Sequence, residues 1–249
     1  SLLGWGLGYF GQPHILARFK GIKSADAVPA ARRIAVIWSA ISMVGACLIG
    51  LAAIGYLPEG LGDSETVFMV LVDALFHPAV AGVLLAAILA AVMSTADSQL
   101  LVSSSALAED FYKALFNQNA SQEKLVQVGR IAVVVIAVIA TFLALDKDSK
   151  VLALVSYAWA GFGAAFGPAL IMSLYWKRMN KTGALAGIIV GGVTVVVWKQ
   201  LSGGLFDLYE IIPGIIFAFI AIIAATLATA PPARSIEQRF EEVEAEIKG

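Results

Sequence analysis

Long apolar segments of similar length alternate along this chain with short polar connections. A helix needs about 20 apolar residues to cross the hydrocarbon core of a bilayer, and several segments reach that length. The alternation of apolar and polar positions that a membrane barrel requires is absent, and backbone polar groups in lipid must be satisfied within the segment. The pattern therefore predicts an all-α membrane protein, with spanning helices at residues 34–56, 79–104, 125–145, 151–176, 183–201 and 211–230.

Three shorter stretches complete this pattern. The apolar stretch 1–19 precedes the first full span, and we expect it to begin inside the membrane as part of a larger protein. Residues 64–78, "SETVFMVLVDALFHP", have helical character but are too short to cross, so they predict a lid or cap at the outer mouth. The tail 235–249 predicts an amphipathic cytoplasmic helix, because one face gathers the apolar side chains of Ile236, Phe240, Val243 and Ile247.

Composition and charge agree with a membrane protein of defined orientation. The chain is 59% hydrophobic and 14% charged, whereas soluble domains have about 45–50% apolar and about 25% charged residues. If the segments cross alternately, all 17 Lys and Arg residues except Lys147, Lys150 and Lys199 fall on one side. The positive-inside rule makes that side cytoplasmic and predicts a cytoplasmic C-terminus. The single Cys47 excludes an intrachain disulfide and is expected to be a small buried side chain.

The stretch 4–14, "GWGLGYFGQPH", predicts a broken helix. It holds four glycines and one proline, and each glycine costs a helix about 0.8–1.0 kcal/mol relative to alanine, proline about 3 kcal/mol. Discontinuous helices in membranes mark the substrate sites of transporters. Any helical portion places Trp5, Tyr9 and Pro13 on one face. A close glycine-mediated helix crossing with interfacial aromatic residues is the alternative interpretation.

The stretch 91–99, "AVMSTADSQ", places polar residues at the middle of a predicted span. Ala91, Ser94, Thr95 and Ser98 share one helical face, near the centre of the bilayer. Hydroxyl and carbonyl oxygens without soft ligands suit a hard monovalent cation. Hydroxyls in membrane helices also bond to neighbouring helices or to their own backbone, so that alternative stays open.

Other features of the spans indicate packing rather than chemistry. Asp97 points away from Ser94 and Thr95, so we expect a structural acid that is hydrogen-bonded to a neighbouring helix or to water. Glycines at 183, 187 and 191 form a stripe that predicts a packing seam, with a dimer contact as the alternative. Pro168 cannot donate a hydrogen bond to the carbonyl of Ala164, which predicts a bend.

No sequence pattern indicates an enzyme. The motifs H-E-x-x-H and G-x-S-x-G are absent, and His14 and His77 are isolated from each other in sequence. The spans offer no continuous polar pore that would favour a channel, and we expect no nucleic-acid partner.

Four stretches together resemble the sodium/solute symporter family. They are "GWGLGYFGQPHILARF", "AAVMSTADSQLLVSSSALAEDFYK", "VSYAWAGFGAAFGPALI" and "SLYWKRMNKTGALAGIIVGGV". The resemblance implies a leucine-transporter-like fold, built from two five-helix inverted repeats with extra helices after them. On that basis residues 1–176 would form the second repeat, 177–230 two additional transmembrane helices and 231–249 a cytoplasmic tail. The first repeat would be missing from this chain.

The same resemblance implies sodium-coupled uptake of L-proline across a bacterial inner membrane, with no organic cofactor. The family's sodium site falls on the carbonyl of Ala91 and the hydroxyls of Ser94 and Thr95. Its proline site falls on Trp5, Tyr9 and Pro13. A symporter for another small carboxylate such as pantothenate, or a sodium-binding membrane sensor, remains the alternative.

Overall fold

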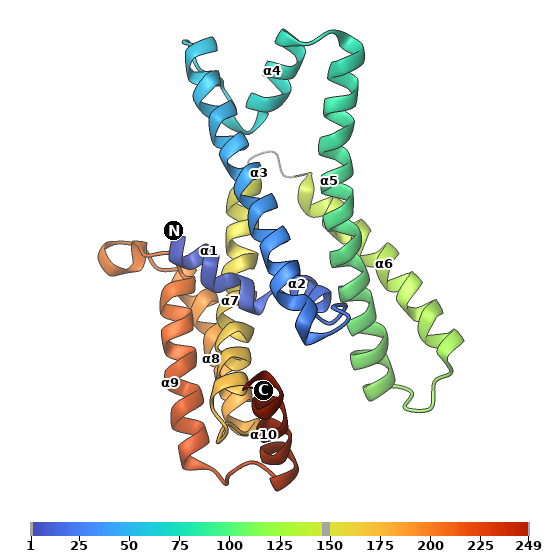
Figure 1. Ribbon diagram of the computed structural model, residues 1–249, viewed down its shortest axis with the longest axis vertical. Coiled ribbons are helices and arrows are strands. Elements are labelled where there is room, and N and C mark those ends of the chain that lie inside the picture. Colours follow the sequence, from blue (N-terminus) through green and yellow to red (C-terminus); the bar gives the residue numbers. More distant parts are fainter. Residues whose placement is uncertain (1, 146–149, 249) are drawn as a thin grey trace. The chain divides into compact units, whose positions relative to one another are not determined.

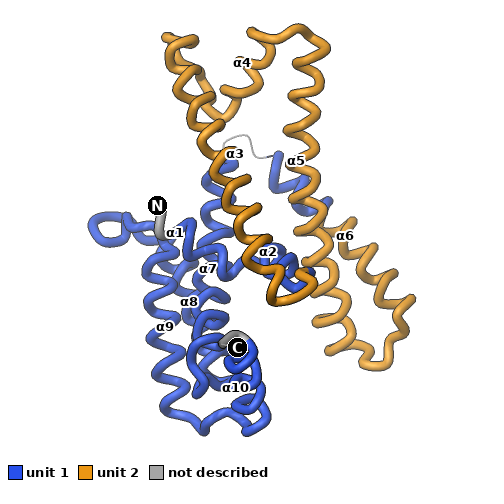
Figure 2. Tube along the Cα trace, viewed as in Figure 1, with its two compact units in different colours: residues 1–21, 137–249 blue, residues 22–136 orange. Residues whose placement is uncertain are grey.

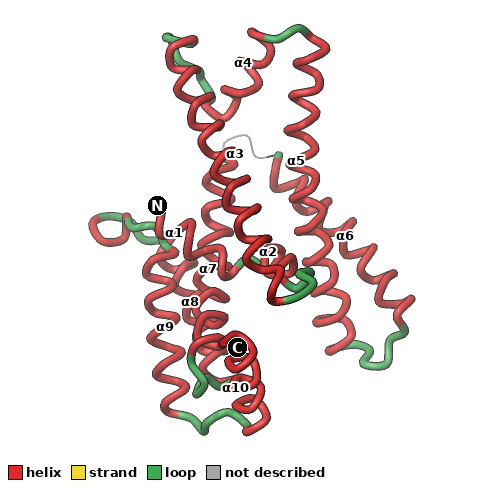
Figure 3. Tube along the Cα trace, in the orientation of Figure 1, coloured by secondary structure: helices red, strands yellow, loops and turns green. Residues whose placement is uncertain are grey.

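The computed structural model describes residues 2–145 and 150–248, and every regular element in those ranges is a helix (Figures 1 and 3). Six of the described helices are long and apolar enough to cross a membrane, which confirms the six predicted spans. They are α3 (Val28–Tyr56), α5 (Pro78–Ser105), α6 (Gln122–Ala144), α7 (Val151–Tyr175), α8 (Lys181–Lys199) and α9 (Ile211–Ala228).

Local sequence signals explain where several spans begin. Pro78 occupies the first turn of α5, where its missing N–H is harmless, and His77 Nδ1 accepts a hydrogen bond from the Ala79 amide at 3.3 Å. The Asn180 side chain caps α8 by accepting from the Gly183 amide at 2.9 Å. At its other end α5 continues as a π-helix, Ala106–Lys113, so this span is longer than the sequence predicted.

Short helices occupy the remaining predicted stretches. The N-terminal stretch is broken into α1 (Leu2–Gly8), a 3-10 turn (Tyr9–Gly11) and α2 (Pro13–Phe19), as its glycines and proline predicted. The expected short helix between the first two spans is α4 (Val67–Leu75), and the tail forms α10 (Arg234–Lys248). Of the residues named above, Lys147 and the side chain of Ile247 lie outside what the structure describes.

The chain divides into two compact units, which are described separately (Figure 2). The unit formed by residues 22–136 buries few side chains: α3 buries only Ala53, and α5 only Ala81 and Ser104. Cys47 is exposed there, so the expectation of a buried cysteine was wrong. The sequence pattern showed an apolar helix, but it did not show which of its faces is covered.

The unit formed by residues 1–21 and 137–249 contains a tightly packed bundle. Its helices α7, α8 and α9 contact one another pairwise and lie side by side in Figure 1. The two glycines Gly183 and Gly187 of α8 face α9, so closely that a methyl group at either would collide with the side chain of Thr226 or Ile222. The glycine stripe is therefore a packing seam within the chain, as predicted. One cluster of buried residues in this bundle consists of Ala160, Ala164, Val195, Ile211 and Ile215.

Candidate functional site

The break in the N-terminal helix is fixed by a buried side chain. Gln12 has an extended backbone, with φ −84° and ψ 111°, which ends the 3-10 turn and lets Pro13 start α2. Only 4% of Gln12 is exposed. Its Nε2 donates to the carbonyl of Gly8 at 3.2 Å and to the carbonyl of Trp159 at 3.3 Å. The side-chain amide at the break thus connects the end of α1 to α7.

Three aromatic rings meet beside this break. The ring of Trp159 lies 5.3 Å from that of Trp5 and 4.8 Å from that of Tyr9, measured between centroids. The Tyr9 contact is edge-to-face, a favourable geometry for aromatic pairs. Trp159 Nε1 also donates to the carbonyl of Trp5 at 3.1 Å. Since 54% of Tyr9 is exposed, the cluster presents an open apolar face with a fixed backing.

The glycines of the broken helix allow its backbone to reach α7. A methyl group at Gly8 would lie 1.9 Å from Trp159 Nε1, and one at Gly11 would lie 2.1 Å from the carbonyl oxygen of Phe162. Either approach is shorter than any real contact, so only glycine fits at these two positions. The close glycine crossing, which the sequence offered as an alternative to a substrate site, is therefore present together with the aromatic cluster.

The structure brings two of the three predicted substrate residues together. Trp5 and Tyr9 share Trp159 as a neighbour, whereas Pro13 lies beyond the break, at the first position of α2. Pro13 and Trp5 are each partly buried. Because Pro13 is the first residue of α2, it determines where that helix begins. The ring cluster, in contrast, belongs to α1, the 3-10 turn and α7.

The predicted cation ligands lie on α5, in the other unit. Thr95 Oγ1 donates to the carbonyl oxygen of Ala91 across 3.3 Å. Oxygen ligands of a hard cation such as Ca²⁺ lie about 2.3–2.6 Å from the metal, so two ligands at right angles are about 3.3–3.7 Å apart. The separation of these two oxygens thus suits neighbouring positions around one ion. Ala91, Ser94 and Thr95 are all exposed.

Hydroxyl groups on this face of α5 also bond to their own helix. Ser98 Oγ donates to the carbonyls of Ser94 and Thr95, at 2.9 and 3.0 Å. The bonding of hydroxyls to their own backbone, which the sequence left open, therefore occurs here. Asp97 is exposed, and within the described part of the chain no neighbouring helix gives it a hydrogen bond or a cation.

Comparison with known proteins identifies the family. The family model described as the sodium:solute symporter family matches residues 1–191. The chain belongs to the sodium:solute symporter family. Membership, together with the six apolar helices, makes it a multi-pass membrane protein from a family of transporters.

Several members of this symporter family are similar over nearly the whole chain. The sodium/proline symporter of Salmonella typhimurium is 53% identical and that of Escherichia coli 51%, in each case over 98% of this chain and 50% of the relative. The high-affinity proline transporter PutP of Bacillus subtilis is 49% identical over 97% of this chain and 52% of its own length. The chain spans about half the length of these curated relatives. No solved structure matches it.

Two residues of this candidate site were missed by the sequence interpretation. Gln12 and Trp159 fix the broken helix, but they are 147 residues apart, and no periodicity connects them. The aromatic and glycine run around Trp159 was the available signal. A groove of about 850 Å³ lies elsewhere, between Tyr175 and Phe240, and no predicted site residue lines it.

Proposed function

We propose that this chain forms part of a transporter that couples the inward movement of sodium to the uptake of L-proline across a bacterial inner membrane, with its C-terminus in the cytoplasm. One observation carries the proposal: an open aromatic cluster on a broken helix, in a chain whose relatives at about 50% identity are named for proline transport. In the proposed protein, residues 1–176 are the second repeat, 177–230 are two additional transmembrane helices and 231–249 are the tail.

Trp5 and Tyr9 provide the contact for the substrate. Their rings form an apolar wall against which the pyrrolidine ring of proline packs, and Trp159 supports both rings from behind. Pro13 determines where the second half of the broken helix begins. The charged amino and carboxylate groups of proline need polar partners, and the part of the protein outside this chain contributes to them, because inverted-repeat transporters bind substrate between their repeats.

Ala91, Ser94 and Thr95 provide part of the sodium site. In the structure the Thr95 hydroxyl donates to the Ala91 carbonyl. With an ion bound, this hydroxyl would turn its hydrogen away, so that both oxygens face the ion and the Ser94 hydroxyl adds a third. Three neutral oxygens do not replace a full hydration shell, so the remaining ligands come from the absent repeat. Residues 1–249 alone are therefore expected to bind neither sodium nor proline and to carry no flux.

Coupling requires that sodium and proline favour the same conformation of the protein. A bound ion changes a conformational equilibrium only through its different affinity for the two states. Sodium binding at α5 would therefore favour the state in which the broken helix accepts proline from outside. The inward sodium gradient then drives uptake.

Uptake of labelled proline by the full-length protein in proteoliposomes tests this function. An imposed inward sodium gradient should drive accumulation, and potassium in its place should not. Trp5→Ala should raise the apparent constant for proline about tenfold or more, because an aromatic contact surface contributes a few kcal/mol. Trp38→Ala is the matched control, since Trp38 lies exposed on α3. Equal proline constants for both variants would overturn the substrate site.

A further inference from the structure

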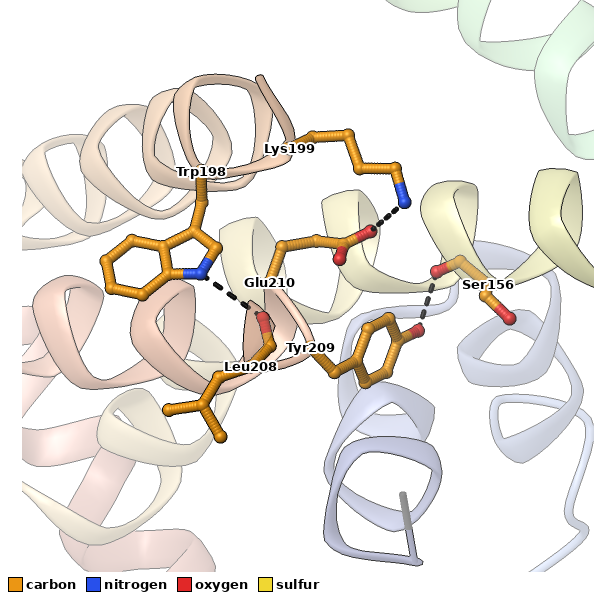
Figure 4. Close-up of polar contacts among 6 residues, drawn as sticks. All are labelled: Ser156, Trp198, Lys199, Leu208, Tyr209 and Glu210. Atoms are coloured by element: carbon orange, nitrogen blue, oxygen red, sulfur yellow. Dashed lines mark hydrogen bonds and ion pairs between the residues drawn. The ribbon is translucent and has the colours of Figure 1, made fainter. Parts of the chain in front are cut away.

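The residues before α9 contact the broken helix directly. The ring of Tyr209 lies against Gly4 of α1, where an added methyl group would come within 2.7 Å of Tyr209 Cδ1. The hydroxyl of Tyr209 donates to the carbonyl oxygen of Ser156 on α7 at 2.6 Å (Figure 4). The side chain of Tyr209 thus links the segment just before α9 to both α1 and α7.

Ile211, at the start of α9, extends this contact. It is fully buried, and its methyl groups lie against Gly4 of α1 and Gly163 of α7. Gly163 in turn lies against the backbone of Gly8, since a methyl group on Gly163 would come within 2.7 Å of the Gly8 Cα. Helix α1, which carries Trp5 and leads directly into Tyr9, therefore lies against both α7 and the beginning of α9.

The segment that carries Tyr209 is itself fixed to α8. Glu210 is 6% exposed, and its carboxylate lies 3.7 Å from the ammonium group of Lys199 (Figure 4). The indole N–H of Trp198 donates to the carbonyl of Leu208 at 3.2 Å. Contacts on both sides of Tyr209 thus hold its ring in place, so that its position defines that of α1.

We propose that Tyr209 is a positioning residue for the substrate site: it acts through Gly4 and Ser156 to set the orientation of α1, and thereby of Trp5 and Tyr9. The proposal rests on the function proposed above. It gives the two helices that follow the second repeat a part in proline recognition, although no residue of α8 or α9 is among the predicted ligands.

Proline uptake by the full-length protein provides the first test. Tyr209→Phe keeps the ring but loses the hydrogen bond, so the apparent constant for proline should rise about threefold to tenfold, at an unchanged maximal rate and protein level. Tyr175→Phe, at an exposed position on α7, should leave the constant unchanged. A Tyr209→Phe protein with the parent's proline constant overturns the proposal.

A second pair of variants tests the contact with Gly4. Gly4→Ala places a methyl group against the Tyr209 ring and should raise the proline constant, whereas Gly6→Ala should not, because nothing lies within 4 Å of that position. Adding Tyr209→Leu to Gly4→Ala relieves the collision with the ring, leaving only the contact with Ile211 at 3.0 Å, and should lower the constant again. If the double variant is as impaired as the two single effects combined, α1 does not act through Tyr209.

Cysteine labelling separates this proposal from the proposed function. With Gly6→Cys as the only cysteine of the full-length protein, the alkylation rate by a polar maleimide should change at least about threefold when Tyr209→Phe is added. This alkylation rate can be measured whether or not the protein transports proline. If the parent takes up no proline but the labelling rate changes, the proposed function fails while the positioning role stands; an unchanged rate overturns the positioning role.

Discussion

The carbonyl oxygen of Ala164 on α7 faces Gly191 on α8, so closely that a methyl group on Gly191 would lie 2.2 Å from it. Pro168 follows Ala164 by four residues within α7 and has no N–H to donate to that carbonyl. The Cα–H of Gly191 points at the same oxygen and supplies a weak compensating contact. The proline that disturbs α7 and the glycine that allows α8 to approach therefore meet at one point of the bundle.

We expect Gly191→Ala to destabilise the protein by about 1–3 kcal/mol, because the added methyl group collides with backbone that cannot move aside. Gly192→Ala is the matched control, since its methyl group would meet only the side chain of Ala165 at 3.9 Å. Thermal unfolding of the purified full-length variants measures the difference. Equal unfolding temperatures would show that α7 and α8 do not pack as described.

We expect Gln12→Ala to weaken both folding and proline binding. It removes the buried amide that bonds to the carbonyls of Gly8 and Trp159, and loss of a buried hydrogen-bond partner costs about 1–3 kcal/mol. The exposed Gln118 offers a control, Gln118→Ala. Unfolding temperature and the proline constant should both change only in the first variant; a Gln12→Ala protein like its parent would contradict this account of the break.

Ser94→Ala and Thr95→Ala should weaken the sodium dependence of uptake about tenfold or more. An oxygen that contacts an ion contributes about as much as a hydrogen bond to a charged group, about 1.5–3 kcal/mol. Ser103→Ala, about two turns further along α5 at an exposed position, should not. Uptake against external sodium compares the three, and identical curves would exclude the proposed site.

Tyr209 gives stability a pH dependence in the alkaline range. Burial, and secondly the charge of Glu210, raise the pKa of Tyr209 to about 12, although its hydrogen bond to Ser156 opposes the shift. Because the pKa is higher in the folded protein than in the unfolded chain, stability is complete below the ordinary value of 10.0 and falls as the pH rises toward 12. Between those pH values the unfolding temperature of the Tyr209→Phe variant should fall less than that of its parent. Parallel losses would show that Tyr209 titrates normally.

Hydropathy was sufficient to predict the spans. The first span was expected at 34–56, and α3 ends at the same Tyr56 but begins earlier, at Val28. The broken helix was also predictable, because glycine and proline act on the local backbone whatever surrounds it. The local bonding of Thr95 and Ser98 was recognised only as an alternative, because a hydroxyl on a helix can turn either toward its own backbone or toward a ligand.

The partners of the broken helix were not predictable in this way. Tyr209 and Gly4 are far apart in sequence, and their contact depends on how α9 packs on α7. No periodic pattern in the sequence predicts that these two residues are in contact. The sequence pattern did not single out Glu210, which is buried in the fold and lies 3.7 Å from the ammonium group of Lys199 at the end of α8.

The glycines of α1 differ in the freedom they leave to evolution. Gly8 has no room for a side chain as long as residue 159 is tryptophan, whereas Gly6 borders open space. Substitutions at 8 and 159 should therefore covary among homologous sequences, with a larger residue at 8 accompanied by a smaller one at 159. Position 6 should instead drift independently of both.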